Sequence, residues 1–136
     1  MNGVTQKHYM SCGVACVSYL TGVAYDEIAK ALSPIKLNFS GFLGVELIDI
    51  LKKHGLNYAG KQLKGDEAEG EFKIGDIVFI EKSASYWAGH FLVKSDKGWM
   101  DPWINLNSAK PWVTDAKSGF REKLPGKPGY LIYKIT

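Results

Sequence analysis

The chain has 136 residues, of which 46% are hydrophobic and 23% charged, and its formal net charge is +3, from 17 basic and 14 acidic side chains. A chain of this length can bury a core without disulfides or a structural metal, so we expect a single domain over residues 1–136. The basic residues are spread along the sequence rather than gathered in a block, which argues against a nucleic-acid partner. No stretch approaches the roughly 18 apolar residues of a membrane-spanning helix, and the N-terminus lacks the pattern of a signal peptide.

The only two cysteines, Cys12 and Cys16, are four residues apart. On a helix this spacing places both thiols on one face but not in disulfide geometry. We therefore expect free thiols and a reducing compartment. That compartment is the cytoplasm, or the cytoplasm of a target cell if the chain is a domain of a larger exported toxin.

The first part of the chain predicts helices. Residues 12–20 are apolar on nearly every side and are followed by Gly22, which indicates a buried helix with a left-handed stop. Residues 26–32 have apolar side chains at the i, i+3, i+4 spacing of a short amphipathic helix that ends ahead of Pro34.

A third helix is expected over residues 43–54 and ends at Gly55, which is well placed as a left-handed cap. Two lysines near its C-terminal end suit the negative end of the helix dipole. The predicted apolar face consists of Leu43, Leu47, Ile50, Leu51 and His54.

After Gly65 the hydrophobic pattern becomes typical of strands. Short β-branched and aromatic runs bounded by turn residues occupy residues 77–80, 91–93, 99–100 and 130–135. Residues 95–98 have the composition of a hairpin turn, and residues 105–128, rich in Lys, Pro, Gly and Ser, predict a long surface excursion. Helices followed by strands predict an α+β fold, with an N-terminal helical half packed on a C-terminal antiparallel sheet.

The start of the first helix is a candidate site for nucleophilic catalysis. A thiol at a helix N-terminus, such as Cys12, lies at the positive end of the dipole and near unpaired backbone N–H groups, which stabilise a thiolate and a developing oxyanion. Such a thiol needs a base and a group that orients the base. His90 begins a predicted strand, and Asp101 follows the partner strand eleven residues later, so a hairpin would bring the two side chains together.

These residues form an ordered pattern together with Gln6, six residues before Cys12. The pattern is Gln6, Cys12-Gly13, the helix end at 51–56, Gly89-His90-Phe91-Leu92-Val93 and Asp101-Pro102. Over roughly residues 6–102 the chain resembles the papain-like cysteine peptidases that process double-glycine leaders of bacteriocins, usually fused to ABC exporters.

The resemblance implies a papain-like fold and a role for each matching residue. Gln6 would donate to the oxyanion, Cys12 would attack, His90 would act as base and then as acid, and Asp101 would orient His90. A thiol hydrolase that cleaves a peptide or amide bond, most naturally a peptidase, is the function implied. Its partners would be a peptide or protein substrate and, for a toxin, an immunity or inhibitor protein.

Two other functions fit the same residues. A deamidase or acyl-transfer toxin domain would use the same triad on another amide. A catalytically silent peptide-binding module would keep the fold without the reaction, although retention of Cys12, His90 and Asp101 together argues against it. Asp101 and Pro102 are also typical of an ordinary strand end and turn.

The remaining candidate residues favour structural roles. Cys16 is expected to pack in the core, His54 to interact with a helix C-terminus, and His8 to be exposed or locally bonded. Core or rim packing is also expected for Trp99, Trp103 and Trp112, whereas Trp87, close to His90, is the better candidate for a substrate groove.

A zinc site is an alternative to these roles, because four side chains of the candidate site are of types that bind zinc: Cys12, Cys16, His90 and Asp101. The Cys-x-x-x-Cys spacing is weak evidence without a second close pair of ligands. We therefore expect neither a metal nor a cofactor.

Overall fold

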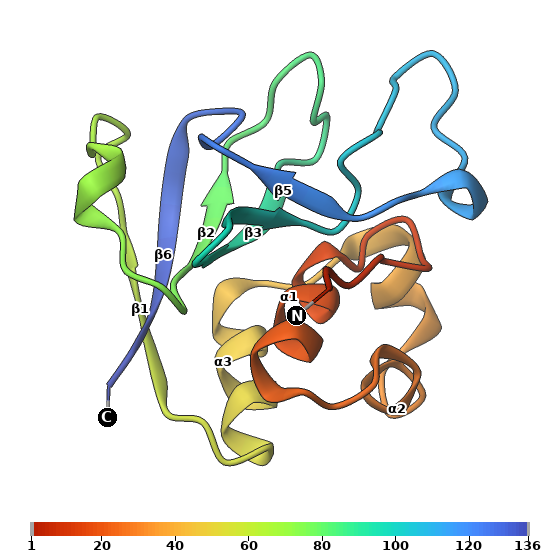
Figure 1. Cartoon of the computed structure of the whole chain (residues 1–136). Coiled ribbons are helices and arrows are strands. Elements are labelled where there is room, and N and C mark those ends of the chain that lie inside the picture. Colours follow the sequence, from red (N-terminus) through yellow and green to blue (C-terminus); the bar gives the residue numbers. More distant parts are fainter. Residues whose placement is uncertain (1, 136) are drawn as a thin grey trace.

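Figure 1 shows the computed structural model of the chain, which describes residues 2–135. The helices, coloured red to yellow, lie together on one side of the green-to-blue strands. The helical elements are α1 (Cys12–Thr21), α2 (Tyr25–Ala29), the π-helical turn η1 (Lys36–Ser40) and α3 (Gly44–Lys53). Two short 3₁₀ turns, η2 (Glu69–Glu71) and η3 (Val113–Asp115), lie in connecting segments. No helix within residues 2–135 has both the length and the apolar character needed to span a membrane.

In the part of the chain that the structure describes, six strands form one antiparallel sheet in the order β1-β6-β2-β3-β4-β5. The strands are β1 (Tyr58–Gln62), β2 (Ile77–Ile80), β3 (His90–Ser95), β4 (Gly98–Asp101), β5 (Gly119–Arg121) and β6 (Pro128–Lys134). This arrangement confirms the predicted α+β class, with N-terminal helices packed on an antiparallel sheet.

Helix α1 is the centre of the helical layer and contacts both β3 and α3. Its side chains from Val14 to Val17 are fully buried, and complete burial of a valine contributes roughly 1.5–3 kcal/mol. Gly22 ends the helix in the left-handed conformation predicted for it, with φ of 74°. At Gly13 a Cβ atom would press on the side chain of Leu47, so a residue without a side chain lets α1 approach α3.

Helix α3 buries a narrower face than the sequence predicted. Leu47, Ile50 and Leu51 are buried, but Leu43 is 68% exposed and His54 is also exposed, so their assignment to the apolar face was wrong. Both lie just outside the helix: Leu43 precedes its first turn in an extended conformation, and His54 follows its last turn. Gly55 has φ of 85°, in agreement with the predicted left-handed cap.

The helix predicted over residues 26–32 is shorter than expected, because α2 ends at Ala29 and residues 30–32 form a turn. The two edge strands were not predicted. In β1 only Tyr58 is buried, so the strand lacks an alternating apolar pattern, and β5 has three residues. Residues 105–128 are therefore a surface loop followed by an edge strand rather than one continuous excursion.

The β3–β4 hairpin forms as predicted, with Val93 opposite Met100 and Ser95 opposite Gly98. Gly98 has φ of 107°, a conformation that glycine adopts without strain, and Ser95 Oγ accepts the Lys97 N–H at 3.1 Å across the turn. The opposite end of this hairpin carries the first residue of β3 and the last residue of β4, which are His90 and Asp101. The turn thus sets the register that brings these two residues together.

The two faces of the sheet bury alternate residues of each strand, as the two-residue period of a strand requires. The face toward the helices includes Ile77, Phe91, Val93, Met100 and Ile132. The opposite face packs with loop residues in a second cluster that includes Val78, Ile80, Leu92, Trp99 and Leu131. Trp99 is 1% exposed, which confirms its predicted core position.

Candidate active site

Cys12 is the first residue of α1 and is partly buried beside β3. The Phe91 N–H donates to its Sγ atom at 3.4 Å. Ser11, at the N-cap, does not cap the helix. Instead, its hydroxyl donates to the His8 carbonyl at 2.9 Å and accepts from Tyr25 Oη at 2.6 Å. The N-terminus of α1 therefore has no side-chain cap and can face an anion at Cys12.

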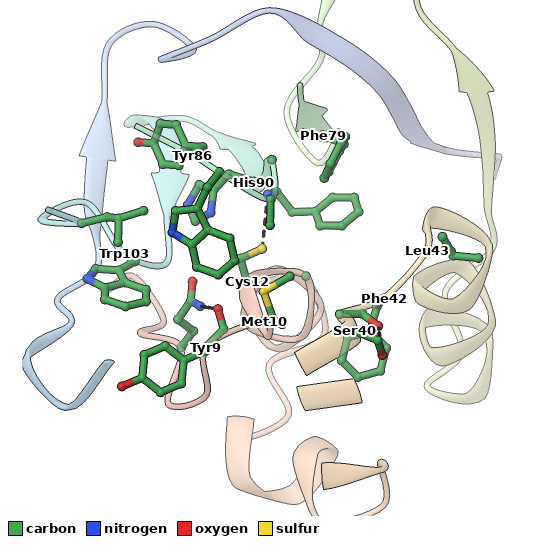
Figure 2. Close-up of a pocket in the computed structure, with 18 residues that line it drawn as sticks. Tyr9, Met10, Cys12, Ser40, Phe42, Leu43, Phe79, Tyr86, His90 and Trp103 are labelled. Carbon is green, nitrogen blue, oxygen red and sulfur yellow. Dashed lines mark hydrogen bonds between the residues drawn. The ribbon is translucent and has the colours of Figure 1, made fainter. Parts of the chain in front are cut away.

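His90 lies directly beside Cys12 in the pocket (Figure 2). Gly89 leads into β3 with φ of 74°, and a Cβ atom there would overlap the Phe79 ring and the Ile80 carbonyl. The Nε2 atom of His90 lies 2.6 Å from Oδ1 of Asp101. This leaves Nδ1 as the ring nitrogen available to the Cys12 thiol.

The surroundings of His90 favour its protonated form. Burial alone lowers the pKa of His90, but the negative charge of a Cys12 thiolate and hydrogen bonds to Asp101 and Cys12 outweigh it and raise the pKa to about 10. A thiolate at Cys12 and an imidazolium at His90 stabilise one another. A thiolate–imidazolium pair of this kind is the arrangement that supplies a nucleophile and a proton donor in cysteine hydrolases.

Asp101 is completely buried, and hydrogen-bond donors contact both of its carboxylate oxygens. Its Oδ1 atom meets His90 and accepts the Trp103 N–H at 2.9 Å, and its Oδ2 atom accepts from Arg121 Nε at 2.7 Å. Burial raises the pKa of Asp101, but its hydrogen bonds and the charge of His90 outweigh burial and lower the pKa below its usual value. The carboxylate is therefore ionised and held in one orientation.

Two neighbours of this group were missed in the sequence. The Tyr86 ring stacks on the His90 imidazole, with ring centroids 4.8 Å apart and an interplanar angle of 20°. Its hydroxyl accepts from Arg121 Nη2 at 3.0 Å. Arg121 is the only arginine among the 17 basic residues. This singular occurrence is the one feature of the sequence that sets Arg121 apart from the lysines.

Gln6 is 1% exposed and lines the same pocket as Cys12. Its Nε2 atom donates to the carbonyls of His8 at 3.0 Å and Tyr9 at 3.3 Å, while its buried Oε1 atom has no partner among the described residues. The predicted role as an oxyanion donor therefore requires the amide to release its longer bond, to Tyr9. That role remains a prediction.

The pocket around Cys12 and His90 has a volume of about 200 Å³. Seven of the residues that line it have aromatic side chains: Tyr9, Phe42, Phe79, Tyr86, Trp87, Phe91 and Trp103. An adjoining groove toward β6 shares four of the pocket residues, namely Phe42, Leu43, Phe79 and Phe91. Trp87 is 54% exposed at the pocket, as expected for a groove residue, and Leu43 is also exposed there.

The other candidate side chains lie apart from this pocket. Cys16 is fully buried in the core, where burial raises the pKa of its thiol well above the usual value. Both cysteines are free thiols. His8 Nδ1 lies 2.7 Å from Tyr25 Oη, and His54 is exposed at the end of α3. Among residues 2–135 no group of three or more His, Cys, Asp or Glu side chains is arranged to hold a metal ion.

No protein-family model and no curated protein sequence matches the chain. A solved structure does match it: the crystal structure of the peptidase domain of Streptococcus ComA, a bi-functional ABC transporter involved in a quorum-sensing pathway. The two chains superpose with a TM-score of 0.54 at 17% identity, over 96% of this chain and 94% of the ComA domain. At this identity the similarity shows the fold, and it agrees with the papain-like α+β architecture expected from the sequence.

Proposed function

We propose that the protein is a thiol hydrolase that cleaves a peptide bond, with Cys12 as nucleophile, His90 as acid and base, and Asp101 as the group that orients His90. The observation that carries this proposal is the position of His90, which lies between a thiol at a helix N-terminus and a buried carboxylate. The shared fold with the ComA peptidase domain supports the same reaction class.

The reaction begins when the Cys12 thiolate attacks the carbonyl carbon of the substrate. A carbon–sulfur bond forms and the carbonyl π electrons move to oxygen, next to the Cys12 N–H at the start of α1. Gln6 is the second donor in this proposal, once its amide turns from Tyr9. The oxyanion then collapses, the carbon–nitrogen bond breaks, and His90 Nδ1 gives its proton to the leaving amine.

Hydrolysis of the acyl-enzyme reverses these roles. His90, now neutral, takes a proton from a water molecule that attacks the thioester carbon. Collapse of the second oxyanion expels the Cys12 thiolate and releases the carboxylic acid, while His90 keeps the proton. Asp101 stays ionised throughout and accepts from Nε2, so Nδ1 faces the thiol in both steps.

A peptide substrate suits the surface around this site better than a small amide does. The pocket at Cys12 continues into a groove toward β6 through Phe42, Leu43, Phe79 and Phe91. Such a groove can bind several consecutive residues of an extended chain by contact with apolar side chains.

Mass spectrometry of a treated lysate tests this proposal. The wild-type protein should generate new chain termini, Cys12→Ala should generate none, and Cys16→Ala should behave as wild type because Cys16 is buried outside the pocket. Deamidated side chains or new cross-links without new termini would instead show a deamidase or acyl transferase. Binding of the same proteins by wild type and Cys12→Ala, with no covalent change by either, would show a silent binding module.

A further inference from the structure

Arg121 is the only arginine in a chain whose other basic residues are lysines. It ends the edge strand β5, twenty residues after Asp101, and its partly exposed side chain pairs with Asp101 of the candidate triad. Its Nε atom donates to Asp101 Oδ2 at 2.7 Å. Its Nη2 atom donates to the Tyr86 hydroxyl at 3.0 Å and to the Ile104 carbonyl at 3.1 Å.

These contacts tie together three separate segments at Asp101: the end of β4, the loop before β3 and the loop after β4. The guanidinium can do this because its N–H donors lie in a rigid plane and point in different directions. A lysine ammonium is a compact charge without this fork, so it could pair with Asp101 but could not also fix Tyr86 and Ile104 in the same geometry.

The charged and titratable groups that face Asp101 come from every element packed around it. His90 approaches from β3, Arg121 from β5 and Tyr86 from the loop before β3. On α1, burial is the main cause that raises the pKa of the Cys16 thiol, and the negative charge of Asp101 raises it further. Within residues 2–135, Arg121 is thus the one permanent positive charge paired with the carboxylate.

We propose that Arg121 is a positioning residue of the candidate triad, which keeps the buried Asp101 carboxylate ionised and turned toward His90. This inference rests on the proposed function, because it assigns Arg121 a role in the same reaction. Arg121 acts through Asp101 and does not line the pocket around Cys12. Tyr86, held by Arg121 and stacked on His90, completes the support of the imidazole.

Loss of Arg121 should change the pH dependence of the site and not only its stability. Without the guanidinium, Asp101 keeps its burial but loses a charged donor, so the pKa of Asp101 rises. Protonation of Asp101 would then remove the acceptor of His90 Nε2 at a higher pH than in the wild type. In a plot of Cys12 reactivity against pH, the fall in reactivity on the acidic side should therefore occur at a higher pH than in the wild type.

The test is the rate of Cys12 alkylation by iodoacetamide from about pH 4 to about pH 9, in a Cys16→Ala background in which Cys12 is the only thiol. Arg121→Met should move the acidic limb upward by roughly one pH unit or more, the size expected for loss of an opposite charge in contact. Arg121→Lys should keep the limb near its wild-type position because the charge is retained. Lys110→Met, which removes an exposed charge from the loop before β5, should leave the profile unchanged.

A uniform loss of rate at all pH values in Arg121→Met, with no movement of the limb, would overturn the proposal in favour of a merely structural role. If Arg121→Met does not fold, phenylglyoxal modification of the folded protein replaces it, since Arg121 is the only arginine and its side chain is 28% exposed. Modification confirmed at Arg121 should move the limb in the same direction, and an unmoved limb would contradict the proposal. A wild-type Cys12 that reacts no faster than an ordinary thiol would instead refute the proposed function itself.

Discussion

His90 Nε2 and Asp101 Oδ1 lie 2.6 Å apart, and both side chains are almost completely removed from solvent. A buried carboxylate is costly unless donors surround it, and Asp101 accepts from His90, the Trp103 N–H and Arg121. The hydrogen bond fixes which imidazole nitrogen faces Cys12.

Substitutions at Asp101 should separate its role as an acceptor from its role as a charge. Asp101→Ala leaves His90 and Arg121 without their acceptor and should lower kcat for peptide cleavage by roughly 10²-fold or more, the size of a typical acid–base contribution. Asp101→Asn keeps an acceptor oxygen for Nε2 and should lose less. Steady-state kinetics on folded variants measure both effects. If both variants cleaved peptides at the wild-type rate, Asp101 would have no part in catalysis and would be an ordinary residue at the end of a strand.

The raised pKa of His90 predicts a pH-dependent contribution to stability. The pKa in the folded protein, about 10, lies above the ordinary value of 6.5. The protonated imidazole therefore stabilises the fold fully below pH 6.5, and this contribution is lost as the pH rises through about 10. Because the charge of Cys12 is a main cause of the shift, Cys12→Ala should lower the pKa of His90.

Titration of the His90 ring protons by NMR checks this prediction in the wild type and in Cys12→Ala. Denaturant unfolding at several pH values gives the matching stability curves. An identical His90 pKa in the two proteins would mean that the thiol does not couple to the imidazole.

Gly89 and Gly22 form a matched pair for testing how His90 is placed. Both have φ of 74°, but a Cβ atom at Gly22 meets nothing within 4 Å, whereas at Gly89 it would overlap Phe79 and Ile80. Gly22→Ala should lower the free energy of unfolding by about 1–2 kcal/mol, because alanine is strained in the left-handed backbone conformation. Gly89→Ala should cost more and also slow Cys12 alkylation. If both variants lost a similar amount of unfolding free energy and kept the wild-type alkylation rate, Gly89 would not be needed to place His90 at the start of β3.

Gln6 can be tested by comparing two reactions of the same thiol. Peptide hydrolysis passes through an oxyanion, whereas alkylation by iodoacetamide does not. If Gln6 donates to the oxyanion, Gln6→Ala should lower kcat by about 10²-fold and leave the alkylation rate near that of the wild type. A parallel fall in both rates would show that Gln6 only holds the loop of His8 and Tyr9, whose carbonyls it binds.

The elements that the sequence predicted well are those with local signals. The apolar run at 12–20, the Gly22 stop and the turn at 95–98 each depend on neighbouring residues, and each lies where it was expected. The contact between His90 and Asp101 follows from the same hairpin. For this reason the central pair of the site could be anticipated without the structure.

The missed features depend on contacts between distant parts of the chain. Strand β1 contains Gly60 and polar residues, and it is a strand because it pairs with β6, where Tyr58 lies opposite Lys134, more than 70 residues later in the chain. Arg121 reaches Asp101 because β5 pairs with β4, and no local sequence pattern predicts that pairing. The orientation of the Gln6 amide is likewise set by the fold of the loop that follows it.

The most direct test of the central claim is the second-order rate of Cys12 alkylation at neutral pH in three proteins: wild type, His90→Ala and His54→Ala. His54 is exposed at the end of α3 and serves as the matched histidine control. We expect Cys12 to react much faster than an ordinary thiol in the wild type and in His54→Ala, and we expect this excess reactivity to disappear in His90→Ala. Equal rates in all three proteins would contradict the proposed pairing of His90 with Cys12.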